Sequence, residues 1–276
     1  MKLYLRTKDF VVSNEEFDLL YDEHNDMLVT QPQPQNISAY YESESYISHT
    51  DANTSLFEKL YQKVKQYNLR KKLSLINRFN RGSQNLLDIG AGTGDFLKVA
   101  QTAGWKGAGV EPNEKAKAKA LEKGMYLNQT LKDLKEEKYT CITLWHVLEH
   151  LPDLDKQITN IVNLLAENGT IFIAVPNFKS YDAKHYGSYW AGFDVPRHLW
   201  HFSKKAISNL FEAHKFQIVK TIPMPFDAFY VALLSEKYKR GGQNMIRAFF
   251  VGLWSNMRAW FTNEYSSHIY ILKKAN

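Results

Sequence analysis

The middle of the chain alternates between two hydrophobic periodicities. Short apolar runs typical of buried strands are followed by stretches in which apolar residues recur every three or four positions, as in helices. The pattern predicts strands at 85–89, 106–110, 139–145 and 169–176, a weaker strand near 125–130, and helices at 94–103, 113–123 and 153–166. This alternation predicts an α/β fold in which crossover helices cover both faces of a mostly parallel sheet.

The flanking regions follow other patterns. Residues 1–53 are polar and tyrosine-rich, and they predict an N-terminal arm or small subregion ahead of a main domain at 54–276. An irregular aromatic stretch at 177–202 is longer than an ordinary connection, which indicates a functional insertion. The remaining expected elements are one or two helices within 54–81, a helix at 203–214, strands at 216–222 and 267–273, and a helical insertion at about 223–263.

One face of the late insertion is unusually apolar. Large apolar side chains follow helical spacing at Ile246, Phe249, Phe250, Leu253, Trp254, Met257, Trp260 and Phe261. We expect this face to pack as a lid or a dimer surface. The two tryptophans, with Arg247 and Arg258, are also compatible with shallow membrane contact or a tunnel for an apolar substrate.

Composition narrows the class of protein. A chain of 276 residues with 44% hydrophobic and 23% charged residues suits one globular domain with embellishments. No apolar run is long enough to span a bilayer, the first ten residues carry charges where a signal peptide would be apolar, and Cys141 is the single cysteine. These features predict a cytoplasmic protein without disulfides, and they leave the oligomeric state open.

The net charge of +6 raises the question of nucleic-acid binding. Many of the basic residues lie within 59–81, where leucines and isoleucines recur at helical spacing. The bases then occupy the solvated face of an amphipathic helix, so a nucleic-acid partner is not favoured.

The clearest chemical signal is a glycine-rich turn after the strand at 85–89. Gly90, Gly92 and Gly94 allow positive φ and close approach of a ligand to the backbone, and Asp88 precedes the first glycine by two residues. A dinucleotide fingerprint requires G-x-G-x-x-G, whereas this turn reads G-x-G-x-G. After the next strand, Glu111 lies where a carboxylate can accept hydrogen bonds from ribose hydroxyls, although an acid favoured by the helix dipole would occupy the same place.

The form D-x-G-x-G-x-G resembles motif I of the class I S-adenosylmethionine-dependent methyltransferases. The resemblance implies a Rossmann-like seven-stranded, mostly parallel sheet with an antiparallel last strand, and S-adenosylmethionine as the cofactor. The expected cofactor-binding residues are Asp88, Gly90, Ala91, Gly92, Gly94, Asp95, Phe96, Glu111, Pro112, Leu131, Trp145, His146, Tyr41 and His49. Asp95 is explained equally well by helix capping, and packing of the arm on the core is the simpler role for Tyr41 and His49.

A second cluster follows the strand at 139–145. His146 to His150 match the H-x-x-E-H pattern of some zinc peptidases, but that pattern needs a helix of several turns, and Pro152 leaves too little room. We therefore favour the resemblance to a small-molecule methyltransferase subset in which H-x-L-E-H closes over the cofactor, and we expect no metal. Paired cysteines that carry a zinc ribbon in some relatives are absent from 17–34.

The stretch 193–202 resembles a D-x-P-R-H-x-x-H-F motif of the same subset. Asp194 and Arg197 are as compatible with a structural ion pair as with catalysis. The candidate catalytic residues are His146, His150, His198 and His201, whose ordinary pKa suits general-base catalysis.

The resemblance implies transfer of a methyl group to a small-molecule, sugar or lipid-like acceptor by in-line displacement. Two alternatives remain. The chain is a noncatalytic S-adenosylmethionine sensor or assembly partner if it binds without turnover, and an NAD-dependent oxidoreductase if NADH binds instead. The glycine spacing disfavours the oxidoreductase.

Overall fold

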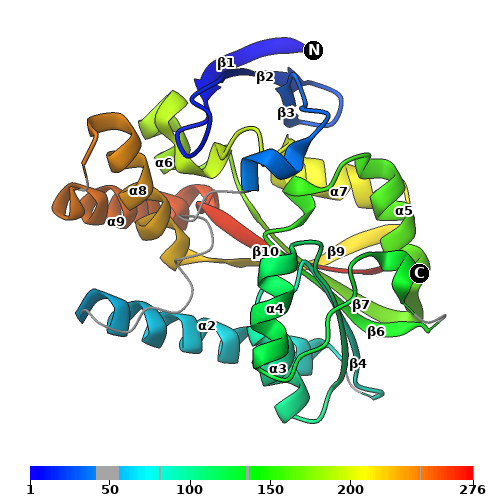
Figure 1. The fold of residues 1–276 in the computed structure, drawn as a ribbon. Coiled ribbons are helices and arrows are strands. Elements are labelled where there is room, and N and C mark those ends of the chain that lie inside the picture. Colours follow the sequence, from blue (N-terminus) through cyan, green and yellow to red (C-terminus); the bar gives the residue numbers. More distant parts are fainter. Residues whose placement is uncertain (42–55, 81, 135–136, 243, 276) are drawn as a thin grey trace. The chain divides into compact units, whose positions relative to one another are not determined.

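The computed structural model describes residues 1–41, 56–80, 82–134, 137–242 and 244–275 (Figure 1). The chain divides into two compact units. Unit 1 comprises Met1–Ser43, His146–Ile158 and Ile173–Tyr270, and unit 2 comprises Glu44–Trp145, Thr159–Phe172 and Ile271–Asn276. Helix α5 (Leu154–Leu164) and strands β7 (Leu165–Pro176) and β10 (Ser267–Lys274) contain residues of both units.

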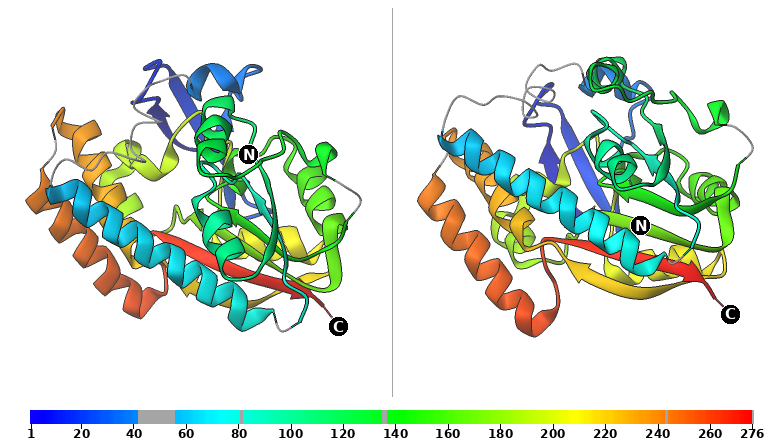
Figure 2. Two further views of the ribbon diagram at one scale, coloured as in Figure 1. Left: turned by 60° about the horizontal axis from the view of Figure 1, so that its bottom comes forward. Right: turned by 90° about the horizontal axis from the view of Figure 1, so that it is seen from below.

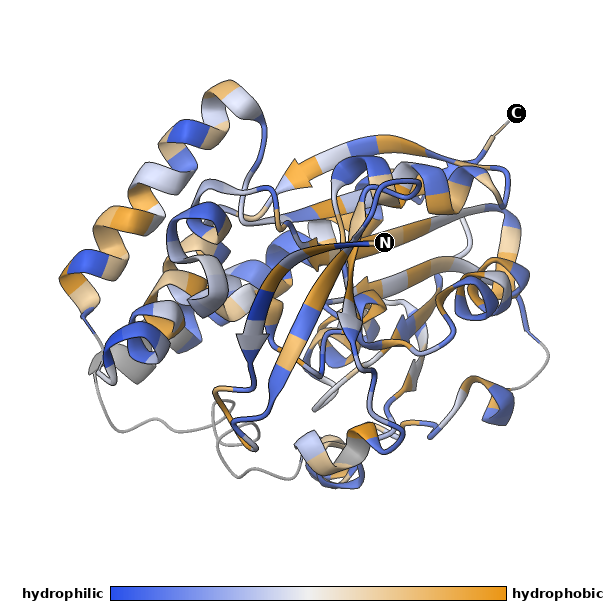
Figure 3. Cartoon of the chain, turned by 90° about the horizontal axis from the view of Figure 1, so that it is seen from above, coloured by the Kyte–Doolittle hydropathy of each residue, from blue (hydrophilic) through white to orange (hydrophobic). Residues whose placement is uncertain are grey.

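Unit 2 contains the alternating strands and helices that the hydrophobic pattern predicts. Its elements are α2 (Leu56–Phe79), β4 (Asn85–Ile89), α3 (Asp95–Thr102), β5 (Lys106–Val110), α4 (Glu114–Glu122), a 3-10 turn at Leu131–Asp133 and β6 (Tyr139–Trp145). Strand β4 pairs in parallel with both β5 and β6. The strands are largely hydrophobic and the helices mix both residue classes (Figure 3), as expected for a sheet buried under amphipathic helices.

Two glycines of β5 allow helix α3 to approach the sheet. A Cβ atom at Gly107 would lie 2.4 Å from Leu97, and one at Gly109 would lie 2.5 Å from Leu127 and 2.9 Å from Leu97. Because no side chain occupies these positions, Leu97 packs directly on the strand backbone and is fully buried. This packing fixes the helix that follows the glycine turn.

Within the described part of the chain, the main sheet has six strands in the order β5-β4-β6-β7-β10-β9, with β9 at Phe216–Pro223. At the start of β10, the Asn177 amide donates to Ser266 and the Met224 amide donates to Ser267, so β10 begins where both neighbouring strands end. The last strand is therefore antiparallel, as predicted. The prediction of seven strands was wrong, because the weak segment near 125–130 contributes only a single parallel bridge from Asn128 to Val110. Strand β7 begins at Leu165, ahead of the predicted start at residue 169.

Unit 1 builds a second sheet from the N-terminal region. Strands β1 (Lys2–Lys8), β2 (Glu16–Asp22), β3 (Met27–Gln31) and β8 (Trp200–His201) are ordered β1-β2-β3-β8. Around them lie a 3-10 turn at Ile37–Tyr41, α6 (Tyr181–Tyr186) and α7 (Lys204–Glu212). Phe17, Leu19 and Leu28 share one core with Tyr186 and Phe193. The aromatic stretch thus covers the N-terminal sheet.

The late insertion is a helical hairpin of α8 (Pro225–Arg240) and α9 (Met245–Thr262), which lie side by side in every view (Figures 1 and 2). Small residues of α9 pack inward, and Gly252 lets its backbone approach Phe229. The eight large apolar residues predicted to pack are all exposed, with Trp260 69% and Phe261 85% accessible. No described helix is both long enough and apolar enough to cross a membrane.

Candidate active site

The glycine turn in unit 2 is held open by its backbone. Gly90, Gly92 and Gly94 have φ values of 68°, 55° and 74°, a region that favours glycine. The amides of Gly90 and Ala91 donate to Val110 at the end of β5. A Cβ atom at Gly92 would meet nothing within 4 Å, so space remains beside the turn. Gly94 is tightly packed, since its Cβ would lie 3.2 Å from Met125.

Glu111 ties the turn to the neighbouring strand. Its Oε2 atom accepts from the Gly92 amide and its Oε1 atom accepts from the Asn113 amide, each at 2.9 Å. The residue is only 9% exposed. Carboxylate oxygens are the acceptors that a ribose diol requires. Pro112 is exposed beside it.

Asp88 is fully inside unit 2 at the end of β4. Thr143 Oγ1 donates to its Oδ1 atom at 2.6 Å. Burial raises the pKa of Asp88 to about 7, against opposing contributions from Thr143 and Lys72. A carboxyl group with a pKa near 7 changes its charge in response to small changes in its electrostatic environment. A cationic ligand would stabilise the charged form.

Unit 2 also contains an aromatic pair, Phe96 and Trp145. The Phe96 and Trp145 rings meet edge to face at 5.3 Å, and Lys72 Nζ lies 4.4 Å from the centre of the Trp145 ring. The buried Trp145 Nε1 donor has no hydrogen-bond partner among the described residues. Sequence reasoning assigned Lys72 to a solvated face and overlooked Thr143, because neither lies within a recognisable motif.

Two further predicted residues have identifiable surroundings. Asp95 pairs with Lys65 at 2.7 Å and with Lys123 at 2.8 Å, so it fixes α3 to two other segments. Leu131 opens a 3-10 turn whose N-terminus carries a Thr130 capping box. The predicted contacts of these residues with the cofactor stay predictions.

S-adenosylmethionine is the cofactor that this cradle fits. The turn leaves room at Gly92, Glu111 supplies carboxylate oxygens, and Trp145 has an unpaired donor. The buried Asp88 carboxyl can face a cationic amino acid moiety. A pyrophosphate-containing dinucleotide would instead require the longer glycine spacing.

In unit 1, His146 begins the polar cluster directly after β6. Its φ is 59°, an uncommon value for a residue other than glycine, and its amide donates to Ala174. The ring nitrogens lie 3.4 Å from Glu149 and 3.3 Å from Asp227. Burial lowers the pKa of His146, but the two carboxylates outweigh it and raise the pKa to about 9. The ring is thus protonated at neutral pH, and Asp227 of α8 was not predicted from the sequence.

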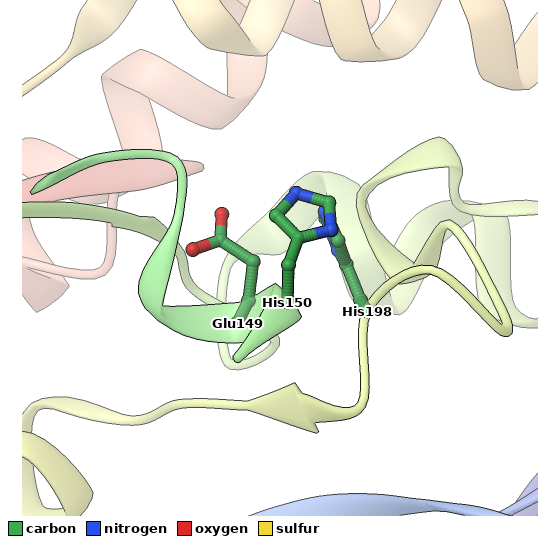
Figure 4. A group of neighbouring side chains, drawn as sticks. All are labelled: Glu149, His150 and His198. Atoms are coloured by element: carbon green, nitrogen blue, oxygen red, sulfur yellow. The ribbon is translucent and has the colours of Figure 1, made fainter. Parts of the chain in front are cut away.

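His150 and His198 lie close together beyond it (Figure 4). Their ring centres are 4.6 Å apart. His150 Nδ1 lies 3.0 Å from the Arg197 carbonyl and 2.9 Å from the Tyr41 hydroxyl. The segment Leu148–His150 forms a 3-10 turn, so it lacks the helix that the zinc-peptidase pattern needs.

Burial sets the charge of the two histidines in the 193–202 loop. Burial and the neighbouring His150 lower the pKa of His198 well below its usual value. His201 is buried at an edge of the N-terminal sheet, 3.0 Å from the Thr30 hydroxyl, and burial lowers its pKa to about 3. Their catalytic roles stay predictions.

Arg197 holds the loop and the N-terminal arm together. It donates to Asp194 at 2.7 Å, to Asp9 at 3.0 Å and to the Tyr40 carbonyl at 3.2 Å. The guanidinium is 1% exposed. The geometry therefore supports the structural alternative for Asp194 and Arg197. Tyr41 contacts His150 in this arrangement, whereas the predicted contact at His49 lies outside the described residues.

Curated relatives match part of the chain. The ubiquinone biosynthesis O-methyltransferase of Vibrio atlanticus (strain LGP32) is 34% identical over 110 residues, covering 36% of this chain and 46% of the relative. The chain thus spans about half the length of the curated relatives it matches.

Solved structures share the fold. Magnesium protoporphyrin IX methyltransferase from Synechocystis PCC 6803, with bound SAH, has a TM-score of 0.57 at 16% identity, covering 86% of this chain and 97% of that one. A SAM-dependent methyltransferase from Archaeoglobus fulgidus has a TM-score of 0.52 at 18% identity, covering 79% and 98%. Residues 61–221, more than half of the chain, match the methyltransferase domain family. The chain therefore belongs to this family and has the class I methyltransferase fold.

Proposed function

We propose that the protein transfers a methyl group from S-adenosylmethionine to a hydroxyl oxygen of a small, partly apolar acceptor. The buried Asp88 carboxyl beside an open glycine turn carries the proposal, because it fits a cationic donor. The O-methyltransferase relatives support oxygen as the accepting atom.

Each residue of the cradle has a role in this proposal. Glu111 accepts hydrogen bonds from the ribose hydroxyls, beside its contacts to the Gly92 and Asn113 amides. Asp88 faces the donor's amino group, directly or through water. Trp145 and Phe96 border the adenosine or methionine moiety and offer the unpaired Nε1 donor. Orientation of this kind lowers the activation barrier by holding the reacting atoms at near-attack distance.

The histidine cluster serves the acceptor. Trp145, the last residue of β6, and His146 are adjacent in the chain. S-adenosylmethionine supplies an activated methyl group whose carbon–sulfur bond breaks as the acceptor oxygen attacks, with the bonding electrons left on sulfur. The acceptor hydroxyl must lose its proton, and the Glu149, His150 and His198 group provides basic atoms for it.

A lipid-like acceptor at a membrane surface agrees with the exposed face of α9. The large apolar side chains of this face are exposed, and the segment from Lys237 to Asn263 contains five basic residues and no acid. Arg240 and Arg247 share the buried Glu236, which neutralises one of the two. An apolar face flanked by basic residues and tryptophans suits an anionic lipid interface, whereas two copies of this surface would repel each other.

Calorimetry followed by a transfer assay tests the proposal. We expect S-adenosylmethionine and S-adenosylhomocysteine to bind with one site per chain, and NADH not to bind. Radiolabelled methyl should then appear in an alkali-stable ether when hydroxylated aromatic acceptors with apolar tails are supplied. Binding without transfer to any hydroxylated acceptor would favour the sensor, and binding of NADH in its place would favour the oxidoreductase.

A further inference from the structure

We propose that Glu149, His150 and His198 bind a divalent first-row transition metal, with Zn²⁺ as the best match. The three side chains each offer one ligand atom, and these atoms lie within 4.8 Å of one another (Figure 4). Ligands of one Zn²⁺ ion at ordinary bond lengths are at most about 4 Å apart. A small side-chain rotation therefore suffices to bring all three onto one ion.

The Glu149 carboxylate is the first independent observation. Its side chain is 1% exposed, and neither oxygen has a hydrogen-bond partner among the described residues. The protonated His146 ring places Nδ1 3.4 Å from Oε1, an ion-pair contact without hydrogen-bond geometry. Buried carboxylates are normally hydrogen-bonded or bound to a metal, so the Glu149 oxygens, which lack hydrogen bonds, have the chemistry to bind a metal ion beside this contact.

The orientation of the histidines is the second observation. His150 Nδ1 lies 3.0 Å from the Arg197 carbonyl, and His198 Nδ1 lies 3.0 Å from the Gly192 carbonyl. A carbonyl only accepts, so a proton on Nδ1 satisfies each of these contacts and directs Nε2 to a metal; the Tyr41 hydroxyl also lies 2.9 Å from His150 Nδ1. Metal-binding histidines are commonly fixed by this contact from the other ring nitrogen to a carbonyl.

The donor set selects the ion. Two imidazoles and one carboxylate suit Zn²⁺ or another transition metal, whereas Mg²⁺ and Ca²⁺ prefer oxygen ligands. Three protein ligands leave a coordination position open, as in catalytic zinc sites. The set differs from the H-x-x-E-H pattern of peptidases, because His146 is replaced by His198 from a distant loop.

The site also deepens the proposed function, on which this step rests. An acceptor hydroxyl bound at the open position would have a lowered pKa, because the cation stabilises the alkoxide or phenolate. With the ion bound, the three side chains would hold the cation in place of taking the proton themselves, and the proton would pass to solvent before transfer.

Cobalt substitution tests metal binding without reference to activity. Metal-free full-length protein is titrated with Co²⁺, and ligand-field absorption is recorded for the wild type and for the Glu149→Gln, His198→Ala and His214→Ala variants. His214 is a partly exposed histidine paired with Asp155, which makes it the matched control for adventitious histidine binding. Loss of a residue that only orients a ligand costs about 10–100-fold in metal affinity, so loss of a ligand should cost at least as much.

We expect one Co²⁺ per wild-type chain, displaced by Zn²⁺, unchanged affinity in His214→Ala, and at least tenfold weaker binding in Glu149→Gln and His198→Ala. Absence of ligand-field absorption in the wild type would overturn the proposal. Equal affinity in Glu149→Gln, which preserves the side-chain shape, would also overturn it. Metal binding as expected in a protein that transfers no methyl group would support the site and refute the proposed function alone.

Discussion

The cofactor cradle of unit 2 and the histidine cluster of unit 1 are built in different ways. The cradle uses a contiguous turn, in which backbone amides and glycines hold Glu111 and leave space at Gly92. The cluster joins side chains from distant segments, fixed by Arg197 between Asp9 and Asp194. The comparison teaches that a binding site for the methyl donor can be recognised from a short local motif. The site proposed for the acceptor depends on side chains that only folding brings together.

The largest expected effect concerns the stability of the cluster. Arg197→Ala leaves Asp9 and Asp194 buried without their cation, and removal of one member of a buried ion pair costs about 3–5 kcal/mol. We expect the thermal midpoint to fall by on the order of 10 °C. Asp95→Ala is the matched variant in unit 2, where the partly exposed pairs contribute at most about 1 kcal/mol. Differential scanning calorimetry of both variants compares the two units, and equal losses would remove the distinction.

The next effect separates donor binding from the cluster. Glu111→Ala removes a carboxylate that bonds the Gly92 amide and is proposed to bind the ribose. Hydrogen bonds to charged groups contribute about 1.5–3 kcal/mol, so S-adenosylmethionine affinity should fall roughly 10–100-fold by calorimetry. Glu149→Gln, in the cluster, should leave this affinity within about twofold. A large loss of donor affinity in Glu149→Gln would show that the two sites are not separate in function.

Much of the fold could be read from the sequence because local periodicity determines it. Strands β5 and β6 occur at the predicted residues, and the antiparallel β10 was also expected. The predicted strand near 125–130 does not form, because this segment makes only a single bridge, at Asn128. The N-terminal sheet was only partly anticipated, since its fourth strand, Trp200–His201, comes from a segment almost 170 residues away.

The candidate site also contains residues that the sequence predicted and residues that it did not. The turn and Glu111 were predictable because backbone conformation and strand order constrain both. Thr143 and Asp227 were not, because each acts through a contact to a residue far away in the chain. The role of the exposed face of α9 as a lid or dimer surface stays a prediction, since periodicity identifies an apolar face without indicating what covers it.

A pH dependence sharpens the account of the cradle. In the ligand-free fold, Asp88 keeps its proton up to a pKa of about 7, whereas an ordinary aspartate loses it near 3.8. The folded state therefore binds more protons between these values, so this group makes stability fall as the pH rises from 3.8 to about 7, and the loss is constant above that.

Donor binding should show the opposite trend. A cationic ligand prefers the ionised carboxylate, so affinity for S-adenosylmethionine should weaken by up to about tenfold per pH unit below 7 and level off above it. Asp88→Asn should bind weakly with a flat profile between pH 6 and 8. Calorimetry across that pH range measures the affinity of both proteins for S-adenosylmethionine. A flat profile in the wild type would contradict the role of Asp88.

The smallest expected effect on stability concerns the surface of unit 1. Phe250→Ser in α9 replaces an exposed side chain, so the free energy of unfolding should change by no more than about 0.5 kcal/mol. Binding to vesicles of anionic phospholipid should nevertheless weaken severalfold in sedimentation assays, because apolar insertion and basic charge act together at such a surface. Leu121→Ser is the matched control, since Leu121 is 52% exposed on α4, outside the α9 face. If both variants bind vesicles as the wild type does, the α9 face is not a lipid contact. A dimer detected by analytical ultracentrifugation would then indicate that a second copy of the chain covers this face.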